Sequence, residues 1–152
     1  YNIKTTFDDM FEIFNTKCDI KELFESTLFE VIKALIDNYI CNMKQYPIIH
    51  FKNFNTQCMY VYKNNAWEVC NVSYIVNGCK SIERNLFKQL NAWQSAASLD
   101  NDGNVSLFTE TAMKLVSNDN NVYQMIRKYM IDVFTMDIKQ IYNNSDEYEI
   151  TH

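Results

Sequence analysis

The stretch from Pro47 to Val69 constrains the fold of this chain more than any other part of the sequence. It contains the only proline, a run of aromatic residues and an Asn-Asn pair at positions 64 and 65. Alternating apolar and aromatic side chains that are bounded by turn residues are typical of short antiparallel strands. We predict strands over 48–52, 58–62 and 67–69, a turn at 53–56 and a tight loop at 63–66. Because so small a sheet cannot stand alone in water, it must lay one face on helices.

The remaining sequence favours helices. Two glycines and one proline in 152 residues are too few for a sandwich or barrel with many tight turns. The length fits one domain with its own core. We therefore predict an α+β fold that is predominantly helical, with about five helices around a small antiparallel β-hairpin sheet. The predicted domain covers 1–152, with helical parts at 6–44 and 73–142, the hairpin at 47–69 and a polar, acidic tail at 144–152.

Apolar residues recur at helical spacing in five segments. The predicted helices run over Thr6–Asn15, over Ile20–Lys44, from a Ser73 cap through Trp93, from a Ser106 cap to a break at 118–121, and over Val122–Tyr142. Gly78 costs a helix about 1 kcal/mol relative to Ala, so a break there is an alternative. Residues 98–105 are the predicted linker. The expected core residues are Phe24, Leu28, Ile32, Leu35, Tyr39, Trp67, Leu86, Leu90, Leu115, Ile126 and Val133.

The first helix carries an aromatic stripe that has two interpretations. Phe7, Met10, Phe11 and Phe14 follow the i, i+3, i+4, i+7 spacing of one helical face. Such a stripe is typical of a helix that packs onto its own core. It is also typical of a partner-binding helix, which makes Phe7, Phe11 and Phe14 candidate partner contacts.

The net charge of −5 argues against nucleic-acid binding by the whole surface, because phosphate neutralisation needs clustered Lys and Arg. A local cluster is nevertheless present. Lys80, Arg84 and Lys88 recur every four residues and so share one helical face. This face is either simply solvated or contacts phosphates. The further candidates for a DNA contact are Arg127 and Lys128, with Tyr60, Tyr62 and Trp67 as stacking platforms.

No catalytic or metal-binding motif is visible in the sequence. It has no P-loop, no dinucleotide fingerprint and no nucleophile elbow. Five cysteines occur without a CxxC pair, which favours reduced cysteines in and around a core over a zinc site. His50 falls in a predicted strand and His152 at the last position, so neither is expected to act as a base or ligand. We predict no intrinsic enzymatic activity, no cofactor and no metal for this segment, and no membrane span.

The hairpin and the helix after it resemble a known viral domain. The run Met59 to Trp67, followed by apolar Ile75, Val76 and Cys79 and then Arg84, resembles the D5 amino-terminal-type domain. That domain precedes the superfamily-3 helicase in poxvirus D5-like primase–helicases and their relatives in other large DNA viruses and phages. Its usual pattern is an aromatic strand, an Asn-containing turn, a Trp and then a helix.

The second half of the chain is similar to the segment that precedes the ATPase in the same family, at 112–117, 121–122 and 125–127. The resemblance covers about 39–142. Two features of the family are missing from this sequence: the closing Asn-Gly segment and the ATPase itself. Residues 48–69 also resemble the carboxy-terminal module of large-DNA-virus proteins that carry KilA-N or zinc-finger segments.

The resemblance implies a non-catalytic accessory domain, or collar, between a primase and a ring helicase in viral DNA replication, in the host cytoplasm or elsewhere inside the cell. It implies protein partners or self-association, and single-stranded DNA is a candidate partner. Because the chain begins at Tyr1, we expect it to be a piece of a larger protein. The alternative is a viral protein-interaction module with no nucleic-acid role. A helical Bcl-2-like decoy belongs to this alternative, although the hairpin argues against it.

Overall fold

The computed structural model describes residues 5–52, 58–97, 102–116 and 120–136. Within these residues the chain forms six helices and a four-stranded sheet, so the predicted α+β, mostly helical fold class is confirmed. The elements in chain order are α1 Phe7–Lys17, α2 Ile20–Glu25, α3 Leu28–Tyr39, β1 Ile48–Phe51, β2 Met59–Lys63, β3 Ala66–Val69, α4 Val72–Ala96, α5 Asp102–Val116, α6 Asn120–Phe134 and β4 Thr135–Met136.

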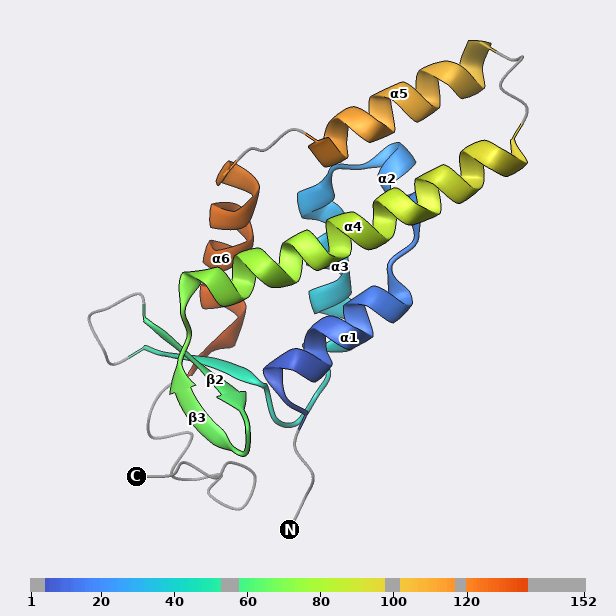
Figure 1. The fold of residues 1–152 in the computed structure, drawn as a ribbon. Coiled ribbons are helices and arrows are strands. Elements are labelled where there is room, and N and C mark those ends of the chain that lie inside the picture. The colour runs from blue at the N-terminus through green and yellow to red at the C-terminus, as the bar shows by residue number, and fades with distance from the viewer. Residues whose placement is uncertain (1–4, 53–57, 98–101, 117–119, 137–152) are drawn as a thin grey trace.

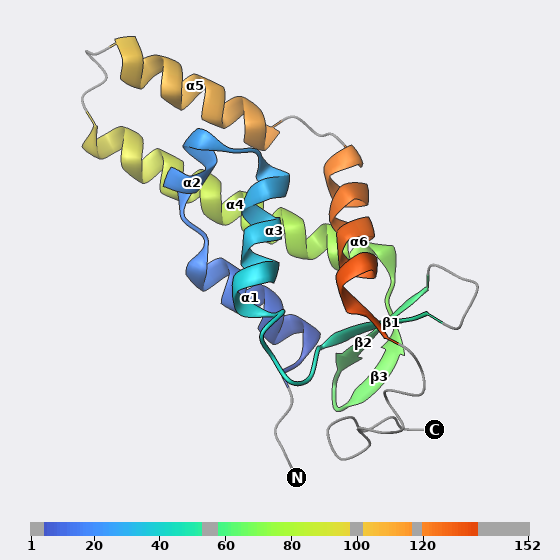
Figure 2. The same cartoon turned by 180° about the vertical axis from the view of Figure 1, so that it is seen from behind.

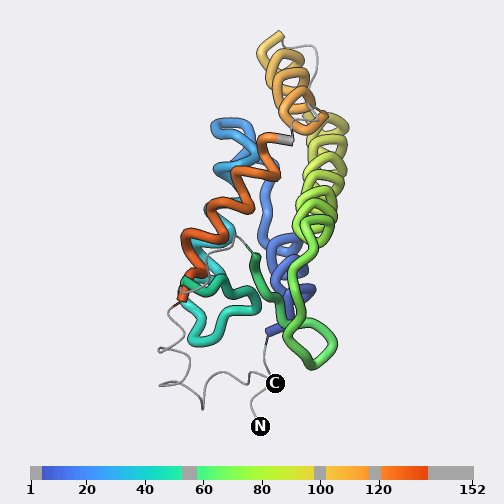
Figure 3. Tube along the Cα trace, turned by 90° about the vertical axis from the view of Figure 1, so that its left-hand side faces the viewer, coloured from blue at the N-terminus to red at the C-terminus, as the bar shows by residue number. Residues whose placement is uncertain are grey.

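The helices form two layers with the sheet at one end (Figures 1 and 2). The long helix α4 crosses the molecule, with α1 beside it, and α3 and α6 lie behind these two. Figure 3 shows α4 and α6 on opposite sides of the molecule when it is viewed from the side. The carboxy-terminal half of α4 continues away from the sheet and pairs with α5. No helix of the described ranges is long and apolar enough to cross a membrane.

The sheet contains the predicted antiparallel hairpin and one strand that the sequence did not indicate. Its strand order is β3-β2-β1-β4, with β2 antiparallel to both β1 and β3 and with β4 parallel to β1. The loop between β2 and β3 has positive φ at Asn64 (51°) and Asn65 (63°). Asn tolerates this left-handed conformation, which a two-residue hairpin turn of type I′ requires at both central positions.

The predicted single helix over 20–44 is wrong. The chain leaves helical geometry at Ser26 and Thr27, which end α2 and begin α3. The Ser26 hydroxyl donates to the carbonyl of Glu22, and the Thr27 hydroxyl accepts from the backbone N–H of Glu30. Ser and Thr compete for backbone hydrogen bonds in this way, so the pair provides two helix ends in mid-pattern. Helix α3 then ends at Tyr39, several residues before Pro47.

Three other predicted helix boundaries also change. The side chain of Asn71, and not that of Ser73, caps α4, which continues through Gly78 without a break. Helix α5 begins at Asp102, so the linker prediction is wrong for 102–105 and Ser106 lies inside the helix. Helix α6 ends at Phe134, because the next two residues join the sheet. The predictions for 53–57, 98–101, 118–119 and the tail at 144–152 fall outside the described residues.

The core lies between the two helical layers and extends over the inner face of the sheet. Most of the expected core residues are buried, namely Leu28, Ile32, Leu35, Leu86, Leu90, Leu115 and Ile126. Phe24, Trp67 and Val133 are half-buried, and the prediction for Tyr39 is wrong, since its side chain is 37 % exposed at the end of α3. The aromatic stripe of α1 is buried in this core.

Candidate functional site

The three cations of α4 form an exposed ridge. Lys80, Arg84 and Lys88, here called the α4 ridge, are all exposed. The ion pairs between described residues join Lys33 to Asp37 and Lys63 to Asp8, and none of them involves the ridge. The ridge therefore presents three exposed cations, none of which forms an ion pair with another described residue.

The other faces of α4 are occupied, which leaves the ridge as the face turned to solvent. Its apolar side packs in the core through Ile75, Cys79, Ile82, Leu86 and Leu90. A polar side binds the end of α1 and the loop after it. There the Asn85 amide donates to the carbonyl of Asn15 (2.7 Å), the Gln89 amide donates to that of Cys18 (3.0 Å), and the Gln89 side-chain oxygen accepts from the N–H of Ile20 (2.9 Å). The helix that carries the ridge is thus fixed on two sides.

A groove lies between the first turns of α4 and helix α6. Its volume is about 530 Å³, and its lining includes Val72, Gln124, Arg127, Lys128 and Asp132. A smaller hollow of about 160 Å³ adjoins it and shares Val72, Gln124 and Arg127 with it. Lys128 is exposed and Arg127 is half-buried, whereas Val72 is 55 % exposed at the rim. Two further cations therefore border an apolar hollow at the start of the helix that carries the ridge.

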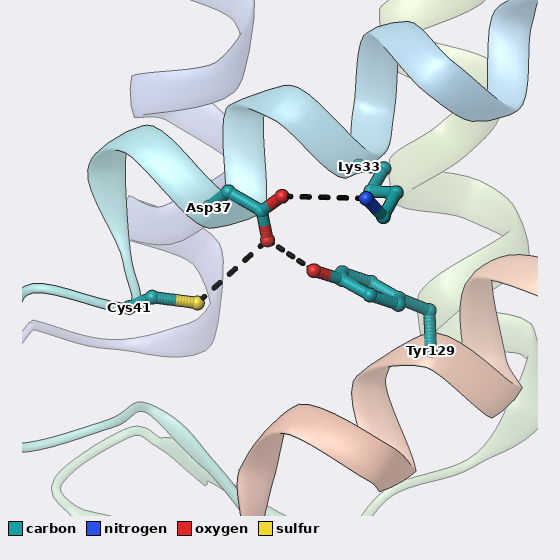
Figure 4. A network of polar contacts seen from close by, with 4 residues as sticks. All are labelled: Lys33, Asp37, Cys41 and Tyr129. Carbon is teal, nitrogen blue, oxygen red and sulfur yellow. Dashed lines mark hydrogen bonds and ion pairs between the residues drawn. The ribbon is translucent and has the colours of Figure 1, made fainter.

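A polar network fixes α6 against α3 (Figure 4). Asp37 of α3 accepts a hydrogen bond from the Tyr129 hydroxyl, and its other oxygen lies 3.7 Å from the ammonium of Lys33. The thiol of Cys41 lies 4.0 Å from Asp37. Burial and the hydrogen bond to Asp37 raise the pKa of Tyr129 to about 12. This phenol remains protonated at neutral pH and serves as a donor, so the network positions α6 and offers no nucleophile.

A second tyrosine fixes α6 against α4. The Tyr123 hydroxyl donates to the Glu83 carboxylate at 2.9 Å. Burial and this hydrogen bond raise the pKa of Tyr123 to about 12. Burial also raises the pKa of Glu83, while Tyr123 and the ridge residues Lys80 and Arg84 lower it. The two tyrosine hydrogen bonds therefore hold the segment of α6 that carries Arg127 and Lys128 against both α4 and α3.

The aromatic candidates lie on the face of the sheet that is turned away from the main core. Tyr60 packs on Phe51 and Tyr62 packs on Trp67, each with ring centroids 5.5 Å apart. Tyr62 is buried, so its ring offers little surface to a ligand, whereas Tyr60 and Trp67 are half-buried. Phe51 was not among the predicted candidates. The register that pairs Ile49 with Tyr60 places Phe51 on the same face, so strand alternation was the signal for it.

The remaining predicted residues lie in the core or in the sheet. Phe7, Phe11 and Phe14 are 2 %, 7 % and 0 % exposed, so the structure places them inside the chain and not on a partner surface. The ring of His50 contacts the Thr135 hydroxyl at 2.9 Å, across the β1–β4 pair. Within the described ranges no three metal-ligating side chains come together.

The cysteines behave as small apolar residues. None of the five cysteines, which all lie in the described ranges, forms a disulfide, and Cys18 and Cys79 are buried. Burial raises the pKa of Cys79 to about 12 and that of Cys70 to about 11, with Arg127 partly opposing the shift at Cys70. Thiols with such pKa values remain protonated at neutral pH and are poor nucleophiles and metal ligands.

No protein-family model, no curated protein and no solved structure matches this chain. The similarity of the hairpin and α4 to the D5 amino-terminal-type domain therefore stays a prediction from the residues that carry it.

Proposed function

We propose that this chain is a non-catalytic accessory domain of a viral DNA-replication primase–helicase, which contacts single-stranded DNA locally and protein partners elsewhere. The observation that carries the DNA contact is the α4 ridge. Its three cations share one exposed face, and no ion pair with another described residue occupies them. The primase–helicase setting rests on the resemblance of residues 59–67 and of the helix that follows.

The spacing of the ridge suits a phosphate backbone. Residues four apart on a helix are separated by about 6 Å along its axis, which is comparable to the distance between successive phosphates of an extended strand. Lys and Arg bind phosphates without reading bases, so the contact is expected to be independent of sequence. A chain with a net charge of −5 repels DNA over most of its surface, which confines binding to local clusters of cations such as this face.

A collar domain needs surfaces for contact more than it needs chemistry. Such a domain guides a strand toward the catalytic parts of its assembly, and weak contacts that exchange quickly suit this role. Three phosphate contacts correspond to a salt slope of about −2 in a log–log plot of affinity against salt concentration, at about 0.7 per contact for single strands. Such a contact is weak at physiological salt, and it gains effective concentration when the domain is tethered beside a helicase.

The test is a binding titration of the purified chain with a fluorescently labelled oligothymidylate, followed by anisotropy. If the ridge alone binds, we expect affinity to fall about 20-fold between about 50 and 200 mM salt. Absence of binding at the lower salt concentration would contradict the DNA contact. An ATP-hydrolysis assay of the same sample should give no activity above that of the buffer.

A protein-interaction module without a nucleic-acid role is the second candidate, and one observation favours it. Val105, Met113 and Val116 are 44 %, 62 % and 54 % exposed and lie on a shared face of α5. An exposed apolar face of this kind is typical of a docking surface. Under this alternative, Met113→Glu would abolish self-association or partner binding that is insensitive to salt, and DNA would not bind.

A further inference from the structure

We propose that the groove between α4 and α6 binds the continuation of the strand that the α4 ridge holds, with a phosphate at Arg127 and Lys128 and a sugar or base against Val72. This inference rests on the proposed DNA contact and extends it to a second site. It assigns to the groove one kind of occupant: a nucleotide unit of a single-stranded nucleic acid.

One row of side chains on α4 connects the two sites. Val72, Val76, Lys80, Arg84 and Lys88 follow one another every four residues, so they form a continuous row along the helix surface. The first two line the hollows beside α6, and the last three are the ridge. The row extends about 24 Å along the helix axis. Because each step of four residues also turns about 40° around the helix, the row winds about 160° around α4 between Lys88 and Val72. A strand that follows the row from the ridge toward the sheet therefore reaches the groove by winding around α4.

The groove has the chemistry of a nucleotide site. Arg127 and Lys128 place two positive charges on consecutive residues of α6 at the groove, and such charges attract a phosphate. Val72 offers an apolar wall, Val76 does so in the adjoining hollow, and Gln124 can donate to and accept from a base edge. Asp132 also lines the groove, and its negative charge leaves a net charge of +1 from the ionised side chains of the lining.

The helix segment that carries the cations of the groove is fixed before any ligand arrives. Tyr123 fixes α6 to α4, and Tyr129 fixes it to α3, on either side of residues 127 and 128. Such preorganisation reduces the entropy that binding would otherwise cost. An acidic peptide could satisfy the same charges, but the α4 row continues from the groove to three more cations, which fits a regularly charged polymer better than a short acidic segment.

The decisive experiment compares salt slopes. If both sites hold the strand, the full chain should bind an oligothymidylate with a slope of about −3.5, whereas the ridge alone gives about −2. The Arg127→Gln, Lys128→Gln double variant should lose about 1.4 of the slope, and Lys128→Gln alone about 0.7, since Lys128 is exposed and its replacement leaves folding intact. The control is Lys17→Gln with Lys21→Gln, two exposed cations on α1 and α2, which should leave the slope unchanged.

A second variant separates binding from structure. Val72→Glu places a carboxylate at the groove wall, at the first position of α4, where an acidic side chain stabilises the helix. Its thermal stability should be equal to or above that of the unchanged chain, while its affinity for the oligothymidylate should fall several-fold. Unchanged affinity would overturn the inference.

The possible failures are distinguishable. A double variant with an unchanged salt slope, in a protein whose binding still depends on the ridge, would overturn the groove site and leave the proposed function standing. Binding that no ridge substitution alters would contradict the proposed function itself. To detect a strand that spans both sites, oligothymidylates of about 4 to 16 nucleotides, the usual range of single-strand site sizes, should gain affinity with length in the full chain and less so in the double variant.

Discussion

The ring of Phe11 lies directly against Gly78, so that a Cβ atom added at position 78 would stand 2.4 Å from a carbon of that ring. Three ring atoms lie within 2.6 Å of this point. The glycine therefore lets α1 approach α4 closely in the amino-terminal third of α4. The sequence left a helix break at Gly78 as an alternative, and in the structure this glycine is a packing site within a continuous helix.

This contact predicts the effect of Gly78→Ala. Alanine should raise helix propensity by about 1 kcal/mol, but overpacking against a buried ring costs about 1–3 kcal/mol. We expect a net loss of about 1 kcal/mol in the free energy of unfolding, measured by urea denaturation. Adding Phe11→Leu should make Gly78→Ala less harmful, because the smaller side chain relieves the clash. A more stable Gly78→Ala protein would show that the ring does not lie there.

Lys114 of α5 caps the carboxy-terminal end of α2. Its ammonium donates to the carbonyl of Leu23 at 2.7 Å and to that of Ser26 at 2.8 Å. Hydrogen bonds from charged groups contribute about 1.5–3 kcal/mol each, so Lys114→Met should lower the free energy of unfolding by about 2 kcal/mol. Amide hydrogen exchange should show faster exchange in α2 and α5 than in α4. Lys21→Met, an exposed lysine of α2, serves as the control and should leave stability within about 0.5 kcal/mol.

The hairpin turn predicts opposite outcomes for two substitutions at Asn65. Because φ is 63° at this position, alanine should cost about 1–2 kcal/mol. Glycine adopts the same conformation without that penalty, so Asn65→Gly should be neutral or slightly stabilising. Thermal melts of the two variants test this pair. Equal melting temperatures would contradict the turn geometry.

The two tyrosines that hold α6 predict a loss of stability at alkaline pH. The pKa values of Tyr123 and Tyr129 are raised to about 12, above the ordinary value of 10.0, through burial and their bonds to Glu83 and Asp37. Both phenols bind protons more tightly in the folded chain. Their contribution is therefore complete below pH 10.0 and is lost as the pH rises through about 12.

Urea midpoints at about pH 9 and about pH 11 measure this loss. The Tyr123→Phe, Tyr129→Phe variant should be less stable at the lower pH and should lose less stability between the two. The control is Tyr60→Phe, a half-buried tyrosine of the sheet. If the double variant and the unchanged chain lose stability in parallel, the two hydroxyls do not hold α6.

The sequence predicted the hairpin and the long helices because these depend on local signals. The Asn-Asn pair requires a particular turn, and apolar spacing alone defines the buried side of α4. The break at Ser26 and Thr27 is different, since apolar periodicity continues across it. A tertiary contact favours the break, because the Lys114 ammonium donates hydrogen bonds to carbonyls at the end of α2. No local pattern contains that contact.

The candidate site was predictable in part for the same reason. The four-residue spacing of Lys80, Arg84 and Lys88 places them on one face whenever the segment is helical. The groove depends on how α6 packs beside the start of α4, and the partners Glu83 and Asp37, which fix α6, lie 40 and 92 residues from their tyrosines. The strand β4 shows the same limit, since two residues pair with β1 only because α6 brings them there.

The most direct test of the account compares two triple variants in the oligothymidylate titration. One changes Lys80, Arg84 and Lys88 to Ala, and the other changes three exposed lysines elsewhere, Lys17, Lys21 and Lys44, to Ala. Both lose three positive charges, so the net charge is matched. We expect that only the ridge variant loses affinity, with the salt slope reduced by about 2. Equal binding by the two variants would contradict a DNA contact through the α4 ridge.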